Sequence, residues 1–250
     1  MAIRYEINPP KINQQTSLSD EETKKLLEIV KLRVSEIESK CDGIHFTDSV
    51  LGVPRVSPVT TGALIRKLNE KIQITTSLRV RDKTLSTISK LMEEIVSNKL
   101  NGVLILKGDP SANEQKDSGI IPSNTVKYFK DLGFDKKIDI YLSLPNNPDF
   151  NKIQKKIEAE PRGFITQVIH SVDEVSRISD KLKPSGFKII PCILLPSEKN
   201  AKSAQFLKLD WSEYKNSIID FIKKIYQITG EVLLTSPNDF NLAKEVLGKL

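Results

Sequence analysis

Cysteine and histidine are both scarce in this sequence, and their scarcity excludes several kinds of site. Cys41 and Cys192 are the only cysteines among 250 residues, too few for a disulfide framework or an iron–sulfur cluster. We therefore expect a protein of a reducing compartment, the cytoplasm. His45 and His170 are the only histidines and lack the spacing of zinc ligands, so no catalytic zinc site is expected.

Long apolar runs are missing as well. No run of about 18 apolar residues occurs, which argues against a membrane-spanning helix. The first ten residues, MAIRYEINPP, contain no apolar core of the kind found in secretory signals. The sequence thus predicts a protein that neither crosses a membrane nor is exported.

Aromatic residues make up only 6% of the chain, which leaves few stacking surfaces for nucleic-acid bases. The formal net charge is +6, but 38 basic residues are interleaved with 32 acidic ones, as on solvated helix faces. Nucleic acid is therefore not an expected partner. A modest positive field would instead attract a phosphorylated cofactor or a polyanionic substrate.

What the sequence does contain is a regular alternation of short apolar segments with segments of helical periodicity. Eight such alternations in a chain of 250 residues favour an α/β fold of the (βα)8 TIM-barrel type, with residues 1–250 in one domain. No G-x-G-x-x-G follows the first strand and no Walker loop occurs, so the usual nucleotide motifs are absent. The predicted strands are 3–7, 44–46, 72–78, 103–106, 138–142, 164–169, 187–195 and 232–234.

The fourth predicted strand ends in a way that suggests a binding site. Residues 103–106 are continuously apolar, as in a strand buried on both faces, and Lys107, Gly108 and Asp109 follow directly. In parallel α/β folds, ligands bind at the carboxyl ends of the strands. Alternatively, because Gly-Asp-Pro is common turn chemistry, the segment is an ordinary exit from a strand.

Two polar residues lie inside predicted strands. If Glu6 faces the barrel interior, burial raises its pKa and suits it to general acid catalysis; alternatively it faces outward or pairs with a cation. Gln167 stands in an apolar segment, where its amide either holds a heterocycle or is a core amide satisfied by the backbone. Further polar residues follow other strands: Thr47, Arg79 and Asp109.

Five separated motifs resemble the methylenetetrahydrofolate reductase family of flavoproteins, in that family's order and over nearly the whole chain. Each match is short, but five matches in the family's order together are specific for the family. The resemblance implies a (βα)8 barrel that binds FAD non-covalently and reduces 5,10-methylene-tetrahydrofolate, or a related tetrahydropterin, to the 5-methyl form. The segments are YEINPP (5–10), HFTDS (45–49), VLILKGDPS (103–111), GFITQ (163–167) and KIIPCILLPS (188–197).

The resemblance also implies roles for individual residues. Glu6 would be the general acid that protonates the N10 side of the substrate and opens it to an iminium. Asp109 would hold the pterin ring and tune the flavin, and Gln167 would contact the pterin and assist catalysis. The residues along the flavin would be Thr47, Lys107, Gly108 and Asp109, with Asp149 and Lys156 at its ribityl and diphosphate region.

The residues themselves support other interpretations for some of these positions. Asp149 begins a predicted helix, 149–159, as its N-terminal cap, and Lys156 on that helix is a solvated charge. Lys107 is the only candidate for a Schiff-base lysine, which a flavin-free aldolase or isomerase barrel would require.

The chain departs from the family pattern at several positions. Lys107 replaces an arginine, which keeps the charge but loses the planar fork. Ile74 replaces a histidine of the third strand, Leu144 and the residues after it replace a tyrosine and a histidine, and an aromatic residue after the seventh strand is missing. A second hypothesis is therefore a family relative that has lost flavin and serves as a binding subunit. Under the first hypothesis the electron donor is NAD(P)H or a redox partner protein, and the chain acts alone or as a homo-oligomer.

Overall fold

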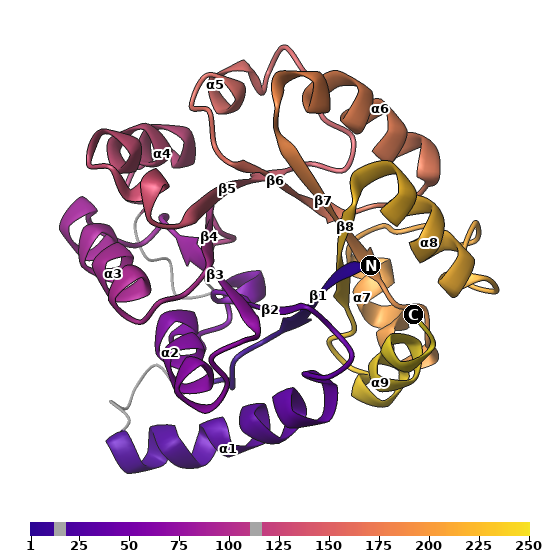
Figure 1. The fold of residues 1–250 in the computed structure, drawn as a ribbon, viewed down its shortest axis with the longest axis horizontal. Coiled ribbons are helices and arrows are strands. Elements are labelled where there is room, and N and C mark those ends of the chain that lie inside the picture. Colours follow the sequence, from indigo (N-terminus) through magenta and orange to yellow (C-terminus); the bar gives the residue numbers. More distant parts are fainter. Residues whose placement is uncertain (13–18, 111–116) are drawn as a thin grey trace.

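The computed structural model describes residues 1–12, 19–110 and 117–250, and its strands form a closed barrel (Figure 1). Eight parallel strands follow one another around the barrel in sequence order, and β8 closes it by pairing with β1. This confirms the predicted (βα)8 TIM barrel. The strands are β1 Ala2–Ile7, β2 Gly43–Phe46, β3 Gln73–Arg79, β4 Gly102–Leu106, β5 Asp139–Leu144, β6 Gly163–Val168, β7 Lys188–Leu194 and β8 Glu231–Thr235.

The helices lie in a ring outside the strands (Figure 1). The predicted helix 149–159 is wrong in extent, because only the four residues of α5 are helical there. None of the described helices is long and apolar enough to cross a membrane. The helices are α1 Asp20–Ile37, α2 Pro58–Leu68, α3 Leu85–Ser97, α4 Pro122–Asp131, α5 Gln154–Ile157, α6 Val172–Leu182, α7 Ala201–Phe206, α8 Ile218–Thr229 and α9 Phe240–Lys249.

Side chains along each strand alternate between two cores, because successive residues of a strand point to opposite sides. Ile3, Tyr5 and Ile7 of β1 point outward and join the core between strands and helices. A smaller cluster fills the barrel interior, and residues in register with its members face the interior as well. That cluster consists of Leu104, Tyr141, Ile165, Ile190, Cys192 and Leu233.

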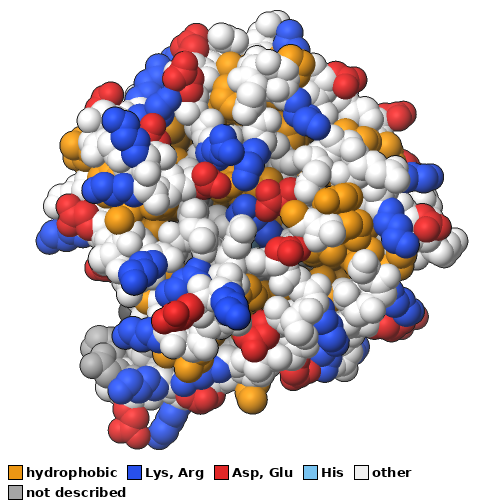
Figure 2. All heavy atoms as spheres, viewed as in Figure 1, with side chains coloured by type: hydrophobic (Ala, Val, Ile, Leu, Met, Phe, Trp, Pro, Cys, Tyr) orange, Lys and Arg blue, Asp and Glu red, His pale blue; other side chains and the backbone are white. Residues whose placement is uncertain are grey.

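A buried arginine fills the interior near the end where the strands begin. Arg4 is 4% exposed, and its guanidinium donates to Glu231 (2.5 Å) and to Thr75 (2.5 Å). A third bond, of 3.4 Å, joins it to the Tyr141 hydroxyl, which donates to Asp139 (2.8 Å). Figure 2 shows acidic and basic side chains together at the centre of this face. Because these partners offset the cost of burying the charge, this end of the barrel is filled with a satisfied polar network.

Candidate active site

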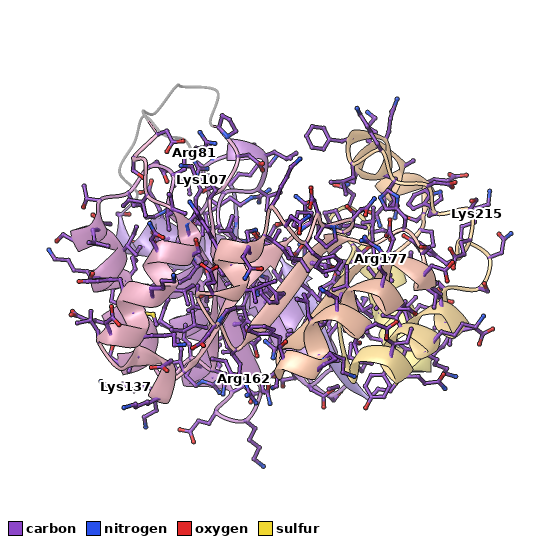
Figure 3. All side chains as sticks on the ribbon, turned by 90° about the horizontal axis from the view of Figure 1, so that it is seen from above. Arg81, Lys107, Lys137, Arg162, Arg177 and Lys215 are labelled. Carbon is purple, nitrogen blue, oxygen red and sulfur yellow. The ribbon has the colours of Figure 1, made fainter. Side chains whose placement is uncertain are left out.

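The carboxyl ends of the strands meet at the other end of the barrel, which we call the mouth. Figure 3 shows Arg81 and Lys107, which follow β3 and β4, at this end, and Lys137 and Arg162, which precede β5 and β6, at the opposite end. In (βα)8 enzymes the mouth carries the active site. The fold brings six predicted residues to it, each at or just after the end of a strand: Glu6, Thr47, Lys107, Gly108, Asp109 and Gln167.

Glu6 points into the barrel. It is in register with Thr235 of β8, and its Oε1 accepts a hydrogen bond from the Thr235 hydroxyl (2.8 Å). The side chain is half-buried. Burial raises the pKa of the carboxyl, and the hydrogen bond from Thr235 offsets only part of that effect. The interior interpretation of Glu6 is confirmed and the outward-facing alternative is wrong. No cation of the described residues forms a salt bridge with Glu6.

Thr47 and Gln167 differ in their exposure. Thr47 is 5% exposed, and its hydroxyl donates to Oδ1 of Asn8 (2.6 Å). Gln167 lies where the pairing of β6 with β7 shifts register, between Ile165 and Val168, and its side chain is exposed. The core-amide interpretation of Gln167 is therefore wrong. Its amide faces solvent at the mouth because the register shift breaks the regular alternation of the strand.

Lys107 and Gly108 each contact a neighbouring residue at the mouth, Asp117 and Arg79 respectively. The Lys107 ammonium donates to Oδ1 of Asp117 (2.7 Å), so its charge is already paired. Gly108 has a φ of +85°, and a Cβ there would lie 2.4 Å from Cγ of Arg79, a side chain that is 2% exposed. Only glycine combines this backbone conformation with so close an approach. The exit of β4 is thus shaped to cover a buried arginine of β3.

Asp109 connects the exit of β4 to the loop after β2. Its side chain is exposed, and Oδ2 accepts a hydrogen bond from the Leu51 backbone N–H (3.1 Å). Leu51 belongs to the 3₁₀ turn η1, Val50–Gly52. Leu51 has a φ of 58° and Ser49 a φ of 46°, a left-handed backbone that is uncommon outside glycine. The carboxylate of Asp109 therefore supports a strained turn at the mouth.

A group of ion pairs surrounds the exit of β3, and only Arg79 among its members was noted from the sequence. The signal for it is the segment RVRDK (79–83), which places three basic side chains and one acidic side chain at the end of a strand. Because each cation has an acidic neighbour, this side of the mouth carries little uncompensated positive charge. The pairs are Arg79–Asp82 (3.3 Å), Lys83–Asp48 (3.2 Å) and Arg81–Asp117 (3.3 Å).

Lys156 is not the solvated charge that the sequence suggested. Its ammonium reaches back from α5 and donates to the carbonyl of Ser143, at the end of β5 (2.6 Å). The side chain is half-buried, and this burial lowers its pKa. No carboxylate of the described residues lies within salt-bridge distance of Lys156. It is a cation at the mouth that can accept an anionic partner.

Asp149 is exposed, and it does not cap a helix. Its carboxylate accepts a hydrogen bond from the Asn151 N–H (3.0 Å), and its carbonyl accepts one from the Ile153 N–H (3.1 Å). Helix α5 begins only after Ile153. The predicted helix cap is therefore wrong, because Asp149 closes a turn that precedes the helix.

Sequence reasoning missed a polar pair inside the barrel below the mouth. His45 of β2 is 1% exposed, and its Nε2 lies 3.0 Å from the Ser77 hydroxyl of β3. Burial, together with the positive charge of Arg4, lowers the pKa of His45 to about 3. The imidazole is therefore neutral near pH 7. Alternation along β2, where Ile44 and Phe46 face the outer core, could have indicated that His45 faces inward, but not which partner it meets.

Two of the departures from the family pattern lie away from the mouth. Ile74 and Leu144 are both completely buried, and both belong to the core between strands and helices. They point outward from the barrel, so neither can line a binding site at the mouth. The inward-facing positions of β3 near the mouth are Ser77 and Arg79, in register with Leu104 and Leu106.

Two hollows in the described surface are unrelated to the mouth. Their volumes are about 420 and 510 Å³. One lies around Arg66 and Asn101 and the other around Arg162 and Gly186, next to the beginnings of strands. Neither contains a predicted site residue.

Comparison with known proteins agrees with the fold and identifies the family. A GH18 chitinase, ChiB from the chitin utilization locus of Flavobacterium johnsoniae, superposes with a TM-score of 0.58 at 12% identity, covering 99% of this chain and 94% of that chain. At this identity the likeness concerns the barrel alone. No curated protein sequence matches the chain. The sequence model of the methylenetetrahydrofolate reductases matches residues 1–227, from β1 to within α8, and the chain therefore belongs to the methylenetetrahydrofolate reductase family.

Proposed function

We propose that this protein is a flavin-dependent reductase that converts 5,10-methylene-tetrahydrofolate, or a related tetrahydropterin, to the 5-methyl form. Membership of the family supports an oxidoreductase acting on a folate. The observation that carries the proposal is Glu6, a half-buried carboxyl with a raised pKa at the mouth of the barrel. We place the whole reaction in residues 1–250 as a single catalytic domain.

Glu6 is the general acid of this proposal. Opening the methylene bridge requires a proton on the N10 side of the substrate, because the leaving nitrogen cannot depart as an anion. Because its pKa is raised by burial, this carboxyl keeps its proton to a higher pH than an ordinary glutamate and is better suited to donate it. The Thr235 hydroxyl, which donates to Oε1 (2.8 Å), then stabilises the carboxylate that is left.

The residues of the mouth fit FAD. Lys156 supplies a half-buried cation that no described carboxylate pairs with, which suits a diphosphate. Gly108, whose side-chain space is taken by Arg79, fixes the left-handed course of the backbone after β4. When bound, FAD supplies the hydride chemistry that no side chain can provide. The residues that would hold it are Thr47, Lys107, Gly108 and Asp109 along the ring, and Asp149 and Lys156 at the ribityl and diphosphate region.

Asp109 and Gln167 are the proposed contacts of the pterin. Both side chains are exposed at the mouth, and one oxygen of Asp109 remains after Oδ2 has accepted the Leu51 N–H. A carboxylate and an amide together match the mixed donors and acceptors of a pterin ring. Asp109 also places a negative charge near the proposed flavin, which would disfavour the reduced, anionic form.

The flavin can be tested for directly. The purified protein, or the protein reconstituted with FAD, should show the visible absorption of an oxidised flavin, and this absorption should bleach when methyl-tetrahydrofolate is added without oxygen. Steady-state assays with NADH, NADPH or a reduced partner protein, one at a time, would identify the electron donor. A colourless protein that cannot be reconstituted would support a non-catalytic binding subunit instead. Ile74 and Leu144, two of the departures that suggested this alternative, lie in the core between strands and helices and away from the mouth.

A further inference from the structure

Four polar side chains on neighbouring strands form a row along one side of the barrel interior, just below the mouth. It runs from Ser77 on β3 through His45 on β2 and Glu6 on β1 to Thr235 on β8. Two of its links are hydrogen bonds, Ser77 to His45 (3.0 Å) and Thr235 to Glu6 (2.8 Å). The middle link is a register pair, because Glu6 stands directly beside His45 across β1 and β2, and residues in register point to the same side of the sheet.

The middle link leaves one polar atom without a partner. His45 Nδ1 is buried and forms no hydrogen bond with any described residue. A neutral imidazole has one N–H and one lone pair. If Nε2–H donates to the Ser77 hydroxyl, Nδ1 carries the lone pair and requires a donor. Unsatisfied buried atoms of this kind are rare in proteins and need a specific explanation.

Among the described residues that face Glu6, the one acceptor still without a donor is Nδ1 of His45. Arg4, two residues earlier on β1, is bound to Glu231, Thr75 and Tyr141. Thr235 on β8 already donates to Oε1. Cys192 on β7 is buried, and burial together with Glu6 keeps its thiol protonated by raising its pKa. This leaves the second carboxyl oxygen, Oε2, and the lone pair of His45.

We propose that His45 is a positioning residue for Glu6: when the Glu6 carboxyl is protonated, its Oε2–H donates a hydrogen bond to the free Nδ1 of His45, and this bond orients the proton until a substrate nitrogen replaces Nδ1 as the acceptor. The proposal rests on the general-acid role assigned to Glu6 above. In the reaction step, the O–H bond of Glu6 breaks and an N–H bond forms on the substrate. Glu6 is left as a carboxylate and regains its proton from solvent through the mouth. His45 stays neutral throughout, and no oxidant or reductant is involved.

The pairing makes a prediction about the titration of Glu6 that does not depend on turnover. A hydrogen bond to the neutral form of an acid raises its pKa. Replacing His45 by leucine should therefore lower the midpoint of the Glu6 titration by about one pH unit. His45→Asn keeps an acceptor oxygen close to the position of Nδ1, so it should restore most of the wild-type midpoint. His170→Asn, a change at the only other histidine, is the matched control and should change nothing.

The measurement is the ¹³C chemical shift of the Glu6 carboxyl in purified, ¹³C-glutamate-labelled full-length protein, assigned by its loss in Glu6→Gln. An unchanged midpoint in a folded His45→Leu protein would overturn the proposal. If that variant does not fold, Ser77→Ala decides, because loss of the bond that orients the imidazole should also lower the midpoint, by a smaller amount. No change in Ser77→Ala would then overturn it.

The titration also separates this proposal from the proposed function. A protein inactive toward methylene-tetrahydrofolate, but with the expected shift in His45→Leu, would refute the function and leave the pairing intact. If the protein is an active reductase and the midpoint of the Glu6 titration is the same in His45→Leu as in the wild type, only the pairing is refuted. In an active reductase, the alkaline limb of kcat/KM should move to lower pH in His45→Leu, together with the titration.

Discussion

The carboxylate of Asp109 accepts a hydrogen bond from the backbone N–H of Leu51 (3.1 Å), across the intervening strand β3. The residue proposed to hold the pterin therefore also supports the turn after β2. These two roles can be separated, because only one of them requires a negative charge.

Asp109→Asn keeps an oxygen that can accept the Leu51 N–H but removes the charge. We expect weaker pterin binding and a shift of the flavin reduction potential to a more positive value, with unchanged thermal stability. Asp109→Ala should show the same functional losses and also a lower melting temperature, since the left-handed turn at Leu51 loses its acceptor. Titration calorimetry with tetrahydrofolate and redox titration of the bound flavin would measure these effects. Wild-type affinity and potential in Asp109→Asn would refute the proposed role.

Glu6→Gln should leave flavin bound and reduce turnover of the methylene substrate by about 10²-fold or more, because an amide cannot deliver the proton. Reduction of the flavin by its electron donor should be unaffected, since that half of the reaction needs no acid. Stopped-flow measurement of the two half-reactions would show the difference. Full activity with methylene-tetrahydrofolate would exclude Glu6 as the acid.

Lys156→Met should weaken FAD binding by about 10- to 100-fold, the usual worth of a charge-assisted hydrogen bond. The neighbouring Lys155 is exposed on the same short helix, so Lys155→Met is a matched control for the loss of one positive charge. Fluorescence quenching of FAD on titration with apoprotein gives both dissociation constants. Equal effects of the two variants would mean that only the net charge matters.

Gly108→Ala should destabilise the protein by more than Gly133→Ala does. Both glycines have a positive φ, +85° and +73°, but the space around Gly133 is open whereas a Cβ at Gly108 would meet Arg79. Each change costs about 1 kcal/mol or more for the backbone conformation, and overpacking at Gly108 adds about 1–3 kcal/mol. Denaturant unfolding of the two variants measures the difference. Equal losses would show that Arg79 moves aside without cost.

Stability should fall in mildly acidic solution because of His45. Its pKa is lowered from 6.5 to about 3 in the folded protein, so between these values the unfolded chain binds a proton that the folded chain does not. The stabilising contribution is therefore complete above about pH 6.5 and is lost as the pH falls toward 3, at up to about 1.4 kcal/mol per pH unit. His45→Asn should flatten this dependence, and His170→Asn should not. Urea unfolding at several pH values between 7 and 4 tests it.

The barrel could be predicted from the sequence because its strands are short, apolar and regularly separated by helical segments. Few folds other than a (βα)8 barrel accommodate eight repeats of that pattern. For Glu6, between Tyr5 and Ile7, the sequence left both an inward and an outward or salt-bridged position open, and only the register with Thr235 decided between them. The pairing of His45 with Ser77 could not be predicted, because it joins side chains 32 residues apart whose meeting depends on register. Lys156 was misjudged for a similar reason: helical periodicity describes the face of a helix but not a long side chain that reaches back to a strand.

The bond between Thr235 and Glu6 spans 229 residues, nearly the whole chain. During synthesis the carboxyl of Glu6 is made 229 residues before its hydroxyl partner, Thr235. Until β8 docks against β1, that carboxyl remains in water and behaves as an ordinary glutamate. Shortened chains that lack β8 would therefore lose the altered acidity of Glu6 together with the closure of the barrel, and its titration would report complete folding.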